Sequence, residues 1–565
     1  MAFQLSPGVN VSEVDLTTVV PSVATTVGGF AGNFNWGPVE EITIISNELQ
    51  LVEKFGKPNG NTATSFFTAA NFLSYANDLR VVRSVGSAAK NANASGTGRL
   101  IKNKTTYDGL VPSTKINTSN YGDIFVAKCP GALGNSLKVS LCDANTTLQS
   151  AWSYTSQFSA NANTSTFASA KGITQDEMHI VVVDEKGLIT GTAGTILEKF
   201  GFVSKVFDAK NEDGTSNYYA EVLNNKSKWV WWLAHPAAVN WEIAGDMIAN
   251  NDTVCELLGN SDYVLTGGVD AAPSTSNIQT GFGLFNNTDS VDVSLLMTGE
   301  VTSDTVPDYV ISLAEERKDC LVFISPPMTA VVNNVGTETS SVKTFRNTLT
   351  SSSFAVMDSG WKYQYDKYND VYRWVPLNGD IAGICAKTDN DRDPWFSPAG
   401  FNRGLIKNVI KLSWNPTKAE RDELYKIGIN PVVTFPGEGT VLYGDKTLLS
   451  RPSAFDRINV RRLFIVLEKS ISRASRSSLF EFNDEFSRAQ FINLVEPFLR
   501  DVRGRRGIYD FRVVCDSTNN TAEVIDRNEF VGDIYIKPSR TTNFIQLNFV
   551  AVRTGVSFNE VVGQF

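Results

Sequence analysis

Histidine, the side chain most often used for acid–base catalysis and a common zinc ligand, occurs only twice in this chain of 565 residues. His179 and His235 lie in different regions, and no HxxxH, HExxH or Cys/His zinc spacing accompanies them. The sequence also lacks the GxSxG motif that presents a nucleophilic serine on a sharp turn. These observations argue against a serine-type triad and a zinc centre. We therefore expect no enzymatic activity, no metal and no cofactor.

The six cysteines form no CxxC pair and are widely separated in the sequence. This spacing indicates small buried side chains with free thiols in a reducing compartment rather than disulfides or metal ligands. The six are Cys129, Cys142, Cys255, Cys320, Cys385 and Cys515.

The segment Gly439-Thr-Val-Leu-Tyr-Gly444-Asp-Lys446-Thr447 is close to a P-loop, in which a lysine directly follows the second glycine. Here Asp445 stands at that position. Its carboxylate would repel the phosphates that such a loop binds through backbone amides. We therefore expect a turn between strands and no nucleotide site.

The segment Asp389-Asn-Asp391-Arg-Asp393 begins like a calcium-binding loop. Such a loop needs glycine at its sixth position and a bidentate glutamate at its twelfth, where this chain has Pro394 and Gly400. The ligand set is too incomplete to predict calcium binding.

Positive charge is concentrated towards the end of the chain. Residues 395–565 carry 24 Lys and Arg against 19 Asp and Glu, although the whole chain has a net charge of −9. The densest run, Arg500–Arg506, has no interleaved aromatic residues of the kind that stack on nucleic-acid bases. We interpret the run as a solvated loop, and the modest excess fits an acidic protein partner at least as well as nucleic acid.

Residues 458–478 have the periodicity of an amphipathic helix. The apolar positions are Val460, Leu463, Phe464, Leu467, Ile471 and Ala474. Lys469, Arg473 and Arg476 are spaced four and three apart and form a basic stripe on a separate face. Two interpretations remain open: an ordinary solvated face, or a docking surface for an acidic partner.

Both ends of the chain have the period-two pattern of half-buried strands. Val9 and Val11 fall on one face near the start, and Val556 and Phe558 do so near the end. Because termini fray unless something ties them down, these strands must pair within the chain or with a neighbouring molecule.

The sequence between the ends predicts a multidomain protein of mixed α/β and α+β class. Asn47 can cap a short helix that Gly56 ends, and residues 180–184 are expected to form a buried strand. Strand, helix and strand patterns at 291–297, 304–317 and 320–324 indicate one βαβ unit.

Several blocks of sequence carry a family resemblance. The most specific are Trp361-Lys-Tyr-Gln-Tyr-Asp-Lys-Tyr-Asn-Asp-Val371, Arg373-Trp-Val-Pro-Leu377, Asp380-Ile-Ala-Gly383 and Ser397-Pro-Ala-Gly-Phe-Asn-Arg-Gly404. Supporting blocks include those at 77–83, 130–140, 319–327, 455–464, 513–521 and 544–558. Together they resemble the contractile tail sheath proteins of T-even-type bacteriophages.

The resemblance implies a structural protein of the virion, assembled in the host cytoplasm, that stacks as hexameric rings around a tail tube and contracts to drive the tube through the host envelope. It implies contacts with further copies of the chain, the tail tube protein, and baseplate and terminator proteins, but not with nucleic acid or a membrane. Alternatives are the sheath of a phage-like injection particle, or a static tail or baseplate protein.

In such sheaths the terminal arms add strands to the sheets of neighbouring subunits. The residues expected to exchange strands here are Val9, Val11, Val14, Val556, Phe558 and Val561. The stripe of Lys469, Arg473 and Arg476 is expected to face the tube.

The resemblance also suggests a division of the chain into domains. The expected parts are an N-terminal strand arm at 1–22, a discontinuous middle domain at 23–120 and 200–394, an inserted β-rich subdomain at 121–199, a C-terminal inner domain at 395–543 and a C-terminal strand arm at 544–565. T-even sheath proteins carry a long insertion between the blocks that match 77–83 and 130–140, and this stretch is short here. We expect their outermost domain to be missing or reduced in this chain.

Overall fold

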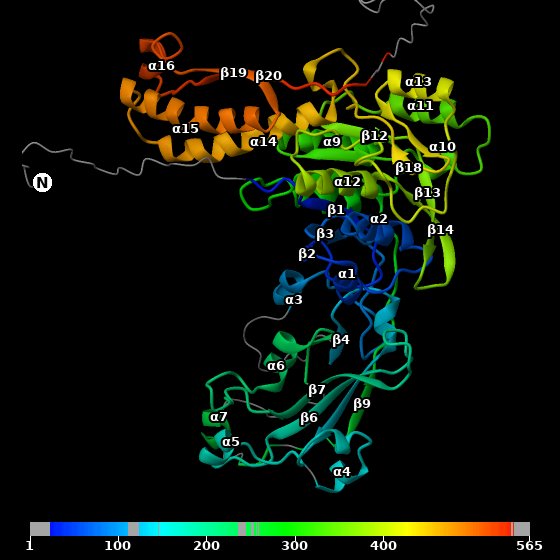
Figure 1. Ribbon diagram of the computed structural model, residues 1–565. Helices are drawn as coiled ribbons and strands as arrows, with labels where there is room; N and C mark the ends of the chain where they lie inside the picture. The colour runs from blue at the N-terminus through cyan, green and yellow to red at the C-terminus, as the bar shows by residue number, and fades with distance from the viewer. Residues whose placement is uncertain are drawn as a thin grey trace, which may run out of the picture. The chain divides into compact units, whose positions relative to one another are not determined.

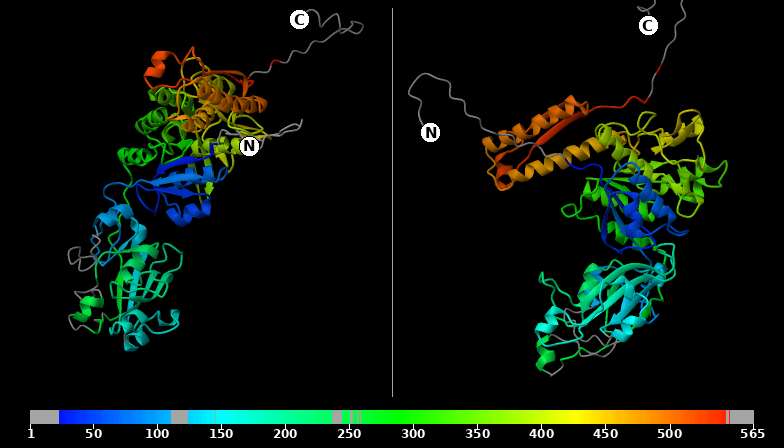
Figure 2. Two further views of the ribbon diagram at one scale, coloured as in Figure 1. Left: turned by 90° about the vertical axis from the view of Figure 1, so that its left-hand side faces the viewer. Right: turned by 60° about the horizontal axis from the view of Figure 1, so that its bottom comes forward.

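The computed structural model describes residues 23–110, 124–144, 146–235, 244–249, 253–255, 257, 259–543 and 546. The chain divides into two compact units (Figures 1 and 2). The larger unit comprises residues 21–472, and the smaller comprises residues 1–20 and 473–565. No helix within the described ranges is long and apolar enough to span a membrane.

A seven-stranded sheet organises the larger unit, in the order β16-β12-β11-β10-β1-β3-β2. Its pairings are parallel except for that between β2 and β3. The strands are β1 (Gly28–Gly32), β2 (Ile42–Ile45), β3 (Leu79–Arg83), β10 (Leu295–Met297), β11 (Leu321–Ile324), β12 (Ala355–Asp358) and β16 (Ile429–Asn430).

Helices cover both faces of this sheet, so its central strands are continuously apolar. Leu295 and Met297 of β10 join the core cluster that includes α2 (Ala63–Leu73) and α12 (Asn378–Asp391). Leu296, between them, joins the cluster that includes α8 (Thr275–Gly283) and α9 (Thr305–Arg317). The expected βαβ unit is confirmed as β10-α9-β11 with parallel strands.

Strand β1 lies in the middle of the sheet and begins with two glycines that leave room for its neighbours. A Cβ atom on Gly28 would lie 2.6 Å from the ring of Phe72 in α2. One on Gly29 would lie 2.7 Å from the Leu296 side chain. Larger residues here would force the layers on both faces apart.

The local signals near the N-terminus produce the expected helix. Asn47 accepts a hydrogen bond from the Gln50 amide and caps α1 (Glu48–Phe55), and Gly56 ends the helix with a φ of 76°. Further helices of the larger unit are α3 (Lys104–Leu110), α4 (Thr146–Ala151), α5 (Thr166–Ala170), α6 (Tyr219–Lys226), α7 (Ala244–Ala249), α10 (Met328–Val331), α11 (Glu338–Thr348) and α13 (Lys418–Lys426).

The inserted β-rich part is larger than the predicted range of 121–199. Its four-stranded antiparallel sheet has the order β7-β6-β5-β9, and a separate pair joins β4 to β8. The strands are β4 (Phe125–Ala127), β5 (Leu137–Asp143), β6 (Glu177–Asp184), β7 (Thr195–Ser204), β8 (Val230–Trp232) and β9 (Ser261–Val264). Strands β8 and β9 lie beyond the predicted end at residue 199 and pair with β4 and β5, a long-range pairing that local periodicity does not reveal.

The predicted boundary at residue 395 also differs from the structure. Strand β16 extends the seven-stranded sheet, and β15 (Lys411–Leu412) pairs with β13 (Trp361–Asp366), which also pairs with β14 (Val371–Pro376). Residues 395–472 therefore belong to the larger unit, together with the hairpin of β17 (Val432–Phe435) and β18 (Gly439–Leu442). Two-residue strands carry too little pattern to be assigned from sequence.

The smaller unit has one long helix and one antiparallel strand pair. Its elements are α15 (Glu485–Gly504), β19 (Ile508–Val514), α16 (Ala522–Asp526) and β20 (Asp533–Pro538). Helix α14 (Ile458–Ser475) begins in the larger unit, and the boundary between the units falls near its C-terminal end.

Candidate functional site

The histidines and cysteines, which could in principle do chemistry, lie in buried or half-buried positions and pack within the fold. His179 is buried and stacks on Phe158 with ring centroids 4.1 Å apart, and its Nδ1 accepts a hydrogen bond from the Phe202 amide. His235 Nδ1 shares a hydrogen bond of 2.7 Å with the Tyr219 hydroxyl, and burial lowers the pKa of the imidazole to about 4. All six cysteines are buried and free, as the sequence predicted.

The P-loop-like segment forms strand β18 and the turn that follows it. Asp445, which replaces the P-loop lysine, is buried and lies 2.9 Å from the Arg457 guanidinium. It also accepts hydrogen bonds from the Tyr425 and Ser397 hydroxyls. The carboxylate is thus a structural anchor for this part of the chain.

The calcium-like segment is largely the end of helix α12. Asp389 forms an ion pair with Arg462, and both side chains are only 4% exposed. No group of three or more potential metal ligands occurs in the described part of the chain. The Arg500–Arg506 run lies at the end of α15 and beyond it, where Arg500 pairs with Glu496 and Arg505 with Asp501.

The three residues of the predicted basic stripe differ in their exposure to solvent. Arg473 and Arg476 are exposed. The Lys469 side chain is only 8% exposed and forms an ion pair with Asp292. Lys469 therefore does not present its charge on an open face, which corrects the expectation for this residue.

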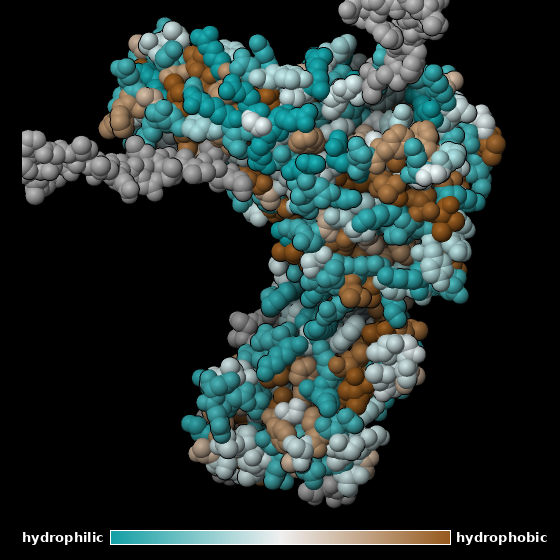
Figure 3. Space-filling model, viewed as in Figure 1, coloured by the Kyte–Doolittle hydropathy of each residue, from teal (hydrophilic) through white to brown (hydrophobic). Residues whose placement is uncertain are grey.

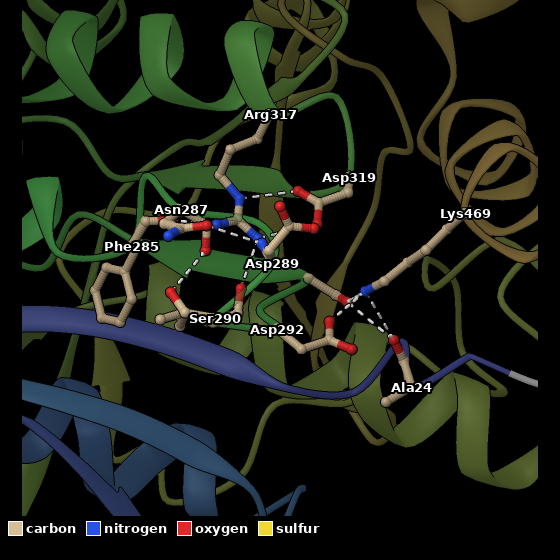
Figure 4. Close-up of polar contacts among 11 residues, drawn as sticks. Ala24, Phe285, Asn287, Asp289, Ser290, Asp292, Arg317, Asp319 and Lys469 are labelled. Atoms are coloured by element: carbon tan, nitrogen blue, oxygen red, sulfur yellow. Dashed lines mark hydrogen bonds and ion pairs between the residues drawn. The ribbon is translucent and has the colours of Figure 1, made fainter. Parts of the chain in front are cut away.

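The ammonium group of Lys469 lies where three segments of the larger unit meet (Figure 4). Its Nζ lies 3.4 Å from the Ala24 carbonyl oxygen and 3.5 Å from the Ser294 hydroxyl, in addition to its contact with Asp292. The Ser294 hydroxyl also donates to the Ala24 carbonyl at 3.1 Å. Ala24 is the second residue after the predicted N-terminal arm.

A buried arginine fixes the loop that carries Asp292. Arg317 binds Asp319 through two hydrogen bonds of 2.9 Å, a bidentate geometry that favours one orientation of the guanidinium (Figure 4). The same group donates to the carbonyl oxygens of Phe285 and Val291. The backbone on the N-terminal side of Asp292 is therefore held by α9.

Two exposed apolar clusters distinguish the surface. In the larger unit, exposed Phe401 and Tyr443 and half-buried Phe435 have ring centroids 5.3–6.0 Å apart, with exposed Leu405 nearby in the chain. Figure 3 shows hydrophobic residues gathered on this face, near β18. The smaller unit exposes a second set, between α14 and the first turns of α15: Leu479, Phe480, Phe482 and Phe486.

The sheet of the smaller unit consists of two strands within the described residues. Within the described residues, β19 and β20 pair only with each other, which leaves one edge of each strand without a strand partner. An isolated strand pair is marginal in water, and unpaired edges are templates for further strands. The predicted exchanging residues Val9, Val11, Val14, Val556, Phe558 and Val561 lie outside the described residues.

Three family models match the chain. The models describe a phage tail sheath protein central domain at residues 291–448, a phage tail sheath C-terminal domain at 450–551, and a tail sheath protein Gp18 domain III N-terminal region at 25–83. The matches fall on both units and leave the inserted β-rich part uncovered.

Curated relatives match almost end to end. The tail sheath protein of Vibrio phage KVP40 is 35% identical over 671 residues, covering 99% of this chain and 100% of that protein. That of Enterobacteria phage T4 is 35% identical over 657 residues, covering 99% of each. Both alignments are longer than this chain of 565 residues, so both relatives carry residues without a counterpart here.

Solved structures share the fold. A sheath tail protein from Listeria innocua matches with a TM-score of 0.54 at 11% identity, covering 93% of this chain and 97% of that one. The sheath complex of an extracellular contractile injection system in the contracted state matches with a TM-score of 0.51 at 14% identity, covering 97% and 98%.

Proposed function

Because the chain belongs to the phage tail sheath protein family, we propose that its copies polymerise as stacked hexameric rings around a tail tube and that the polymer contracts to drive the tube through the host envelope. The observation that carries the proposal is 35% identity over 99% of the chain to tail sheath proteins of two phages. Membership in this family assigns the protein to the phage virion, and we propose assembly in the host cytoplasm.

The role we propose is mechanical and involves no catalysis. The buried histidines and the ion-paired Asp389 and Asp445 support this, because each is used to hold the fold together. Both relatives carry residues without a counterpart in this chain, and this supports a reduced outer domain.

We propose that β19 and β20 receive strands from the terminal arms of neighbouring subunits. Their unpaired edges and the exposed Tyr509 and Tyr535 support this, because added strands would complete the ladder and cover the aromatic rings. The backbone ladder between subunits would then remain intact while domains repack during contraction.

Arg473 and Arg476 are the members of the basic stripe that we propose to face the tube protein. Both are exposed; Arg473 lies in the last turn of α14 and Arg476 directly follows the helix, where positive charge is also favoured by the helix dipole. Baseplate and terminator proteins are the further partners that we propose at the two ends of the sheath.

Electron microscopy of the purified chain tests polymerisation. We expect long hollow tubes at high protein concentration. A chain that lacks residues 1–22 should keep its circular dichroism spectrum and melting temperature but form no tubes. A folded protein that stays monomeric at every concentration would contradict the proposal.

A static tail or baseplate protein is the alternative function. It predicts tubes of a single diameter under all conditions. Tubes that shorten and widen on treatment with acid or denaturant, as a contractile sheath requires, would exclude it.

A further inference from the structure

The first described residues of the chain are held by directed polar contacts rather than by apolar packing. Residues 23–26 are half-buried or exposed, and burial begins at Val27. The Val27 carbonyl accepts hydrogen bonds from the amides of Ser294 and Leu295, at 2.9 and 3.1 Å. We call residues 23–27 the arm root, because they connect the predicted N-terminal arm to β1.

Helix α14 provides two cations beside the arm root. Arg462 and Lys469 are seven residues apart and thus lie on the same face of the helix. Together with Thr25, Ser294 and Leu321 they line a small crevice. Each cation is paired with an acid from a different segment: Asp389 at the end of α12, and Asp292 in the loop before β10.

The Lys469–Asp292 pair contacts the arm root directly, and the Arg462–Asp389 pair lies beside the same crevice. Lys469 Nζ lies 3.4 Å from the Ala24 carbonyl oxygen (Figure 4). Burial raises the pKa of the Asp389 carboxyl, and the nearby Thr25 side chain acts in the opposite direction. Directional contacts at Ala24 and Val27 restrict the course of the chain more than apolar contacts of the same area would.

We propose that Lys469, paired with Asp292, is a positioning residue that mounts the arm root on helix α14. The mount fixes the course of residues 23–27, from which the predicted N-terminal arm begins. This rests on the proposed strand exchange for its purpose, but the mount itself is a property of the single chain. It also gives Lys469 a role different from that of Arg473 and Arg476.

The distance distribution between two spin labels, one of them at the arm root, tests the mount in the unassembled chain. Labels placed by Val23→Cys and Lys343→Cys report the distance between the root and the larger unit, and the native cysteines are all buried. In Lys469→Met we expect the width of the distance distribution to increase roughly twofold, because the root loses its charged anchor. Asp292→Asn should act in the same direction, and Lys469→Arg should restore the narrow distribution.

The matched control is Lys367→Met, which removes an exposed ion pair with Glu48 in the same unit. It should leave the distribution unchanged. A distribution as narrow in folded Lys469→Met and Asp292→Asn as in the parent would overturn the proposal.

Assembly is measured separately by electron microscopy. If the parent forms tubes, Lys469→Met should form fewer of them at the same concentration, whereas Lys367→Met should match the parent; equal tube formation by all three would overturn the proposed purpose of the mount. If the parent itself forms no tubes, the proposed function fails, while the spin-label result still decides whether the mount exists.

Discussion

At the scale of single residues, a buried ion pair and an exposed one differ in how much stability is lost when one partner is removed. Lys362 and Asp380 are both fully buried, 2.8 Å apart, and the Tyr75 hydroxyl donates to the same carboxylate at 3.2 Å. Burial lowers the pKa of Lys362 and raises that of Asp380, so each needs the other to remain charged. Such a pair adds little net stability but is costly to break.

We expect Lys362→Met to lower the free energy of unfolding by about 3–5 kcal/mol, because it leaves a buried carboxylate uncompensated. Chemical unfolding followed by tryptophan fluorescence measures the change. Lys343→Met is the matched control: it breaks an exposed pair with Glu423 and should cost less than about 1 kcal/mol. Equal effects of the two substitutions would show that burial of the pair does not matter.

His235 predicts a pH dependence of stability. Burial lowers its folded pKa to about 4 from the ordinary value of 6.5. Between these values the unfolded chain binds a proton that the folded chain does not, so stability is lost as pH falls from 6.5 to 4, at up to about 1.4 kcal/mol per pH unit. Thermal melts of the parent and His235→Gln across this range should differ in slope, with the shallower slope in the variant; parallel slopes would contradict the assignment.

The burial and pairing of Lys469 could not be predicted from the sequence. Its spacing from Arg473 and Arg476 correctly indicated a helix, and the helical period separates the basic positions from the apolar ones. Its partner Asp292 lies far away in the sequence, in a loop whose place is set by Arg317. Without a fold, nothing in the local sequence distinguishes a buried, paired lysine from an exposed one.

At the scale of elements, the sheet depends on the glycines of β1. Gly28→Ala would place a methyl group 2.6 Å from the Phe72 ring, and we expect it to cost about 1–3 kcal/mol of stability. Phe72→Leu in the same chain should recover part of the loss by providing space. Gly60→Ala is the control, because no atom lies within 4 Å of the added carbon, and a similar loss there would contradict this explanation.

Elements with strong local signals were predicted well. The helix expected at 304–317 is α9 (Thr305–Arg317), and the capping residues Asn47 and Gly56 bound α1 as expected. The strand expected at 291–297 is shorter, because only Leu295–Met297 pairs within the sheet. The errors concentrate where pairing is long-range: β16 and β9 belong to sheets whose other strands lie far away in the sequence.

At the scale of the whole molecule, the family resemblance supplied what periodicity could not. Alternating valines near the ends showed that these segments could pair, but not with what. The edges of β19 and β20 that have no strand partner within the described residues are sites to which an added strand could pair in each copy of the chain. A chain that both lends and receives strands forms an open assembly, because every added copy creates a new acceptor or donor.

This logic predicts that a subunit without its N-terminal arm acts as a chain terminator. The variant lacking residues 1–22 retains β19 and β20 and can still receive a strand, but it cannot lend one at that end. Added to the parent protein before polymerisation, at roughly one part in ten, it should therefore shorten the tubes, because each incorporated variant blocks growth at its site.

The length distribution of tubes in electron micrographs measures this effect. A variant that lacks residues 1–22 and 544–565 and also carries Arg512→Pro and Tyr535→Pro is the control, because proline at these paired positions disrupts the β19 and β20 ladder, so the acceptor is removed together with both donor arms. This double-defective chain should stay out of the tubes and leave their length unchanged. If the single-defective chain also leaves the length unchanged, then the N-terminal arm does not connect neighbouring subunits, and the lattice must be held by the C-terminal arm or by surfaces other than exchanged strands.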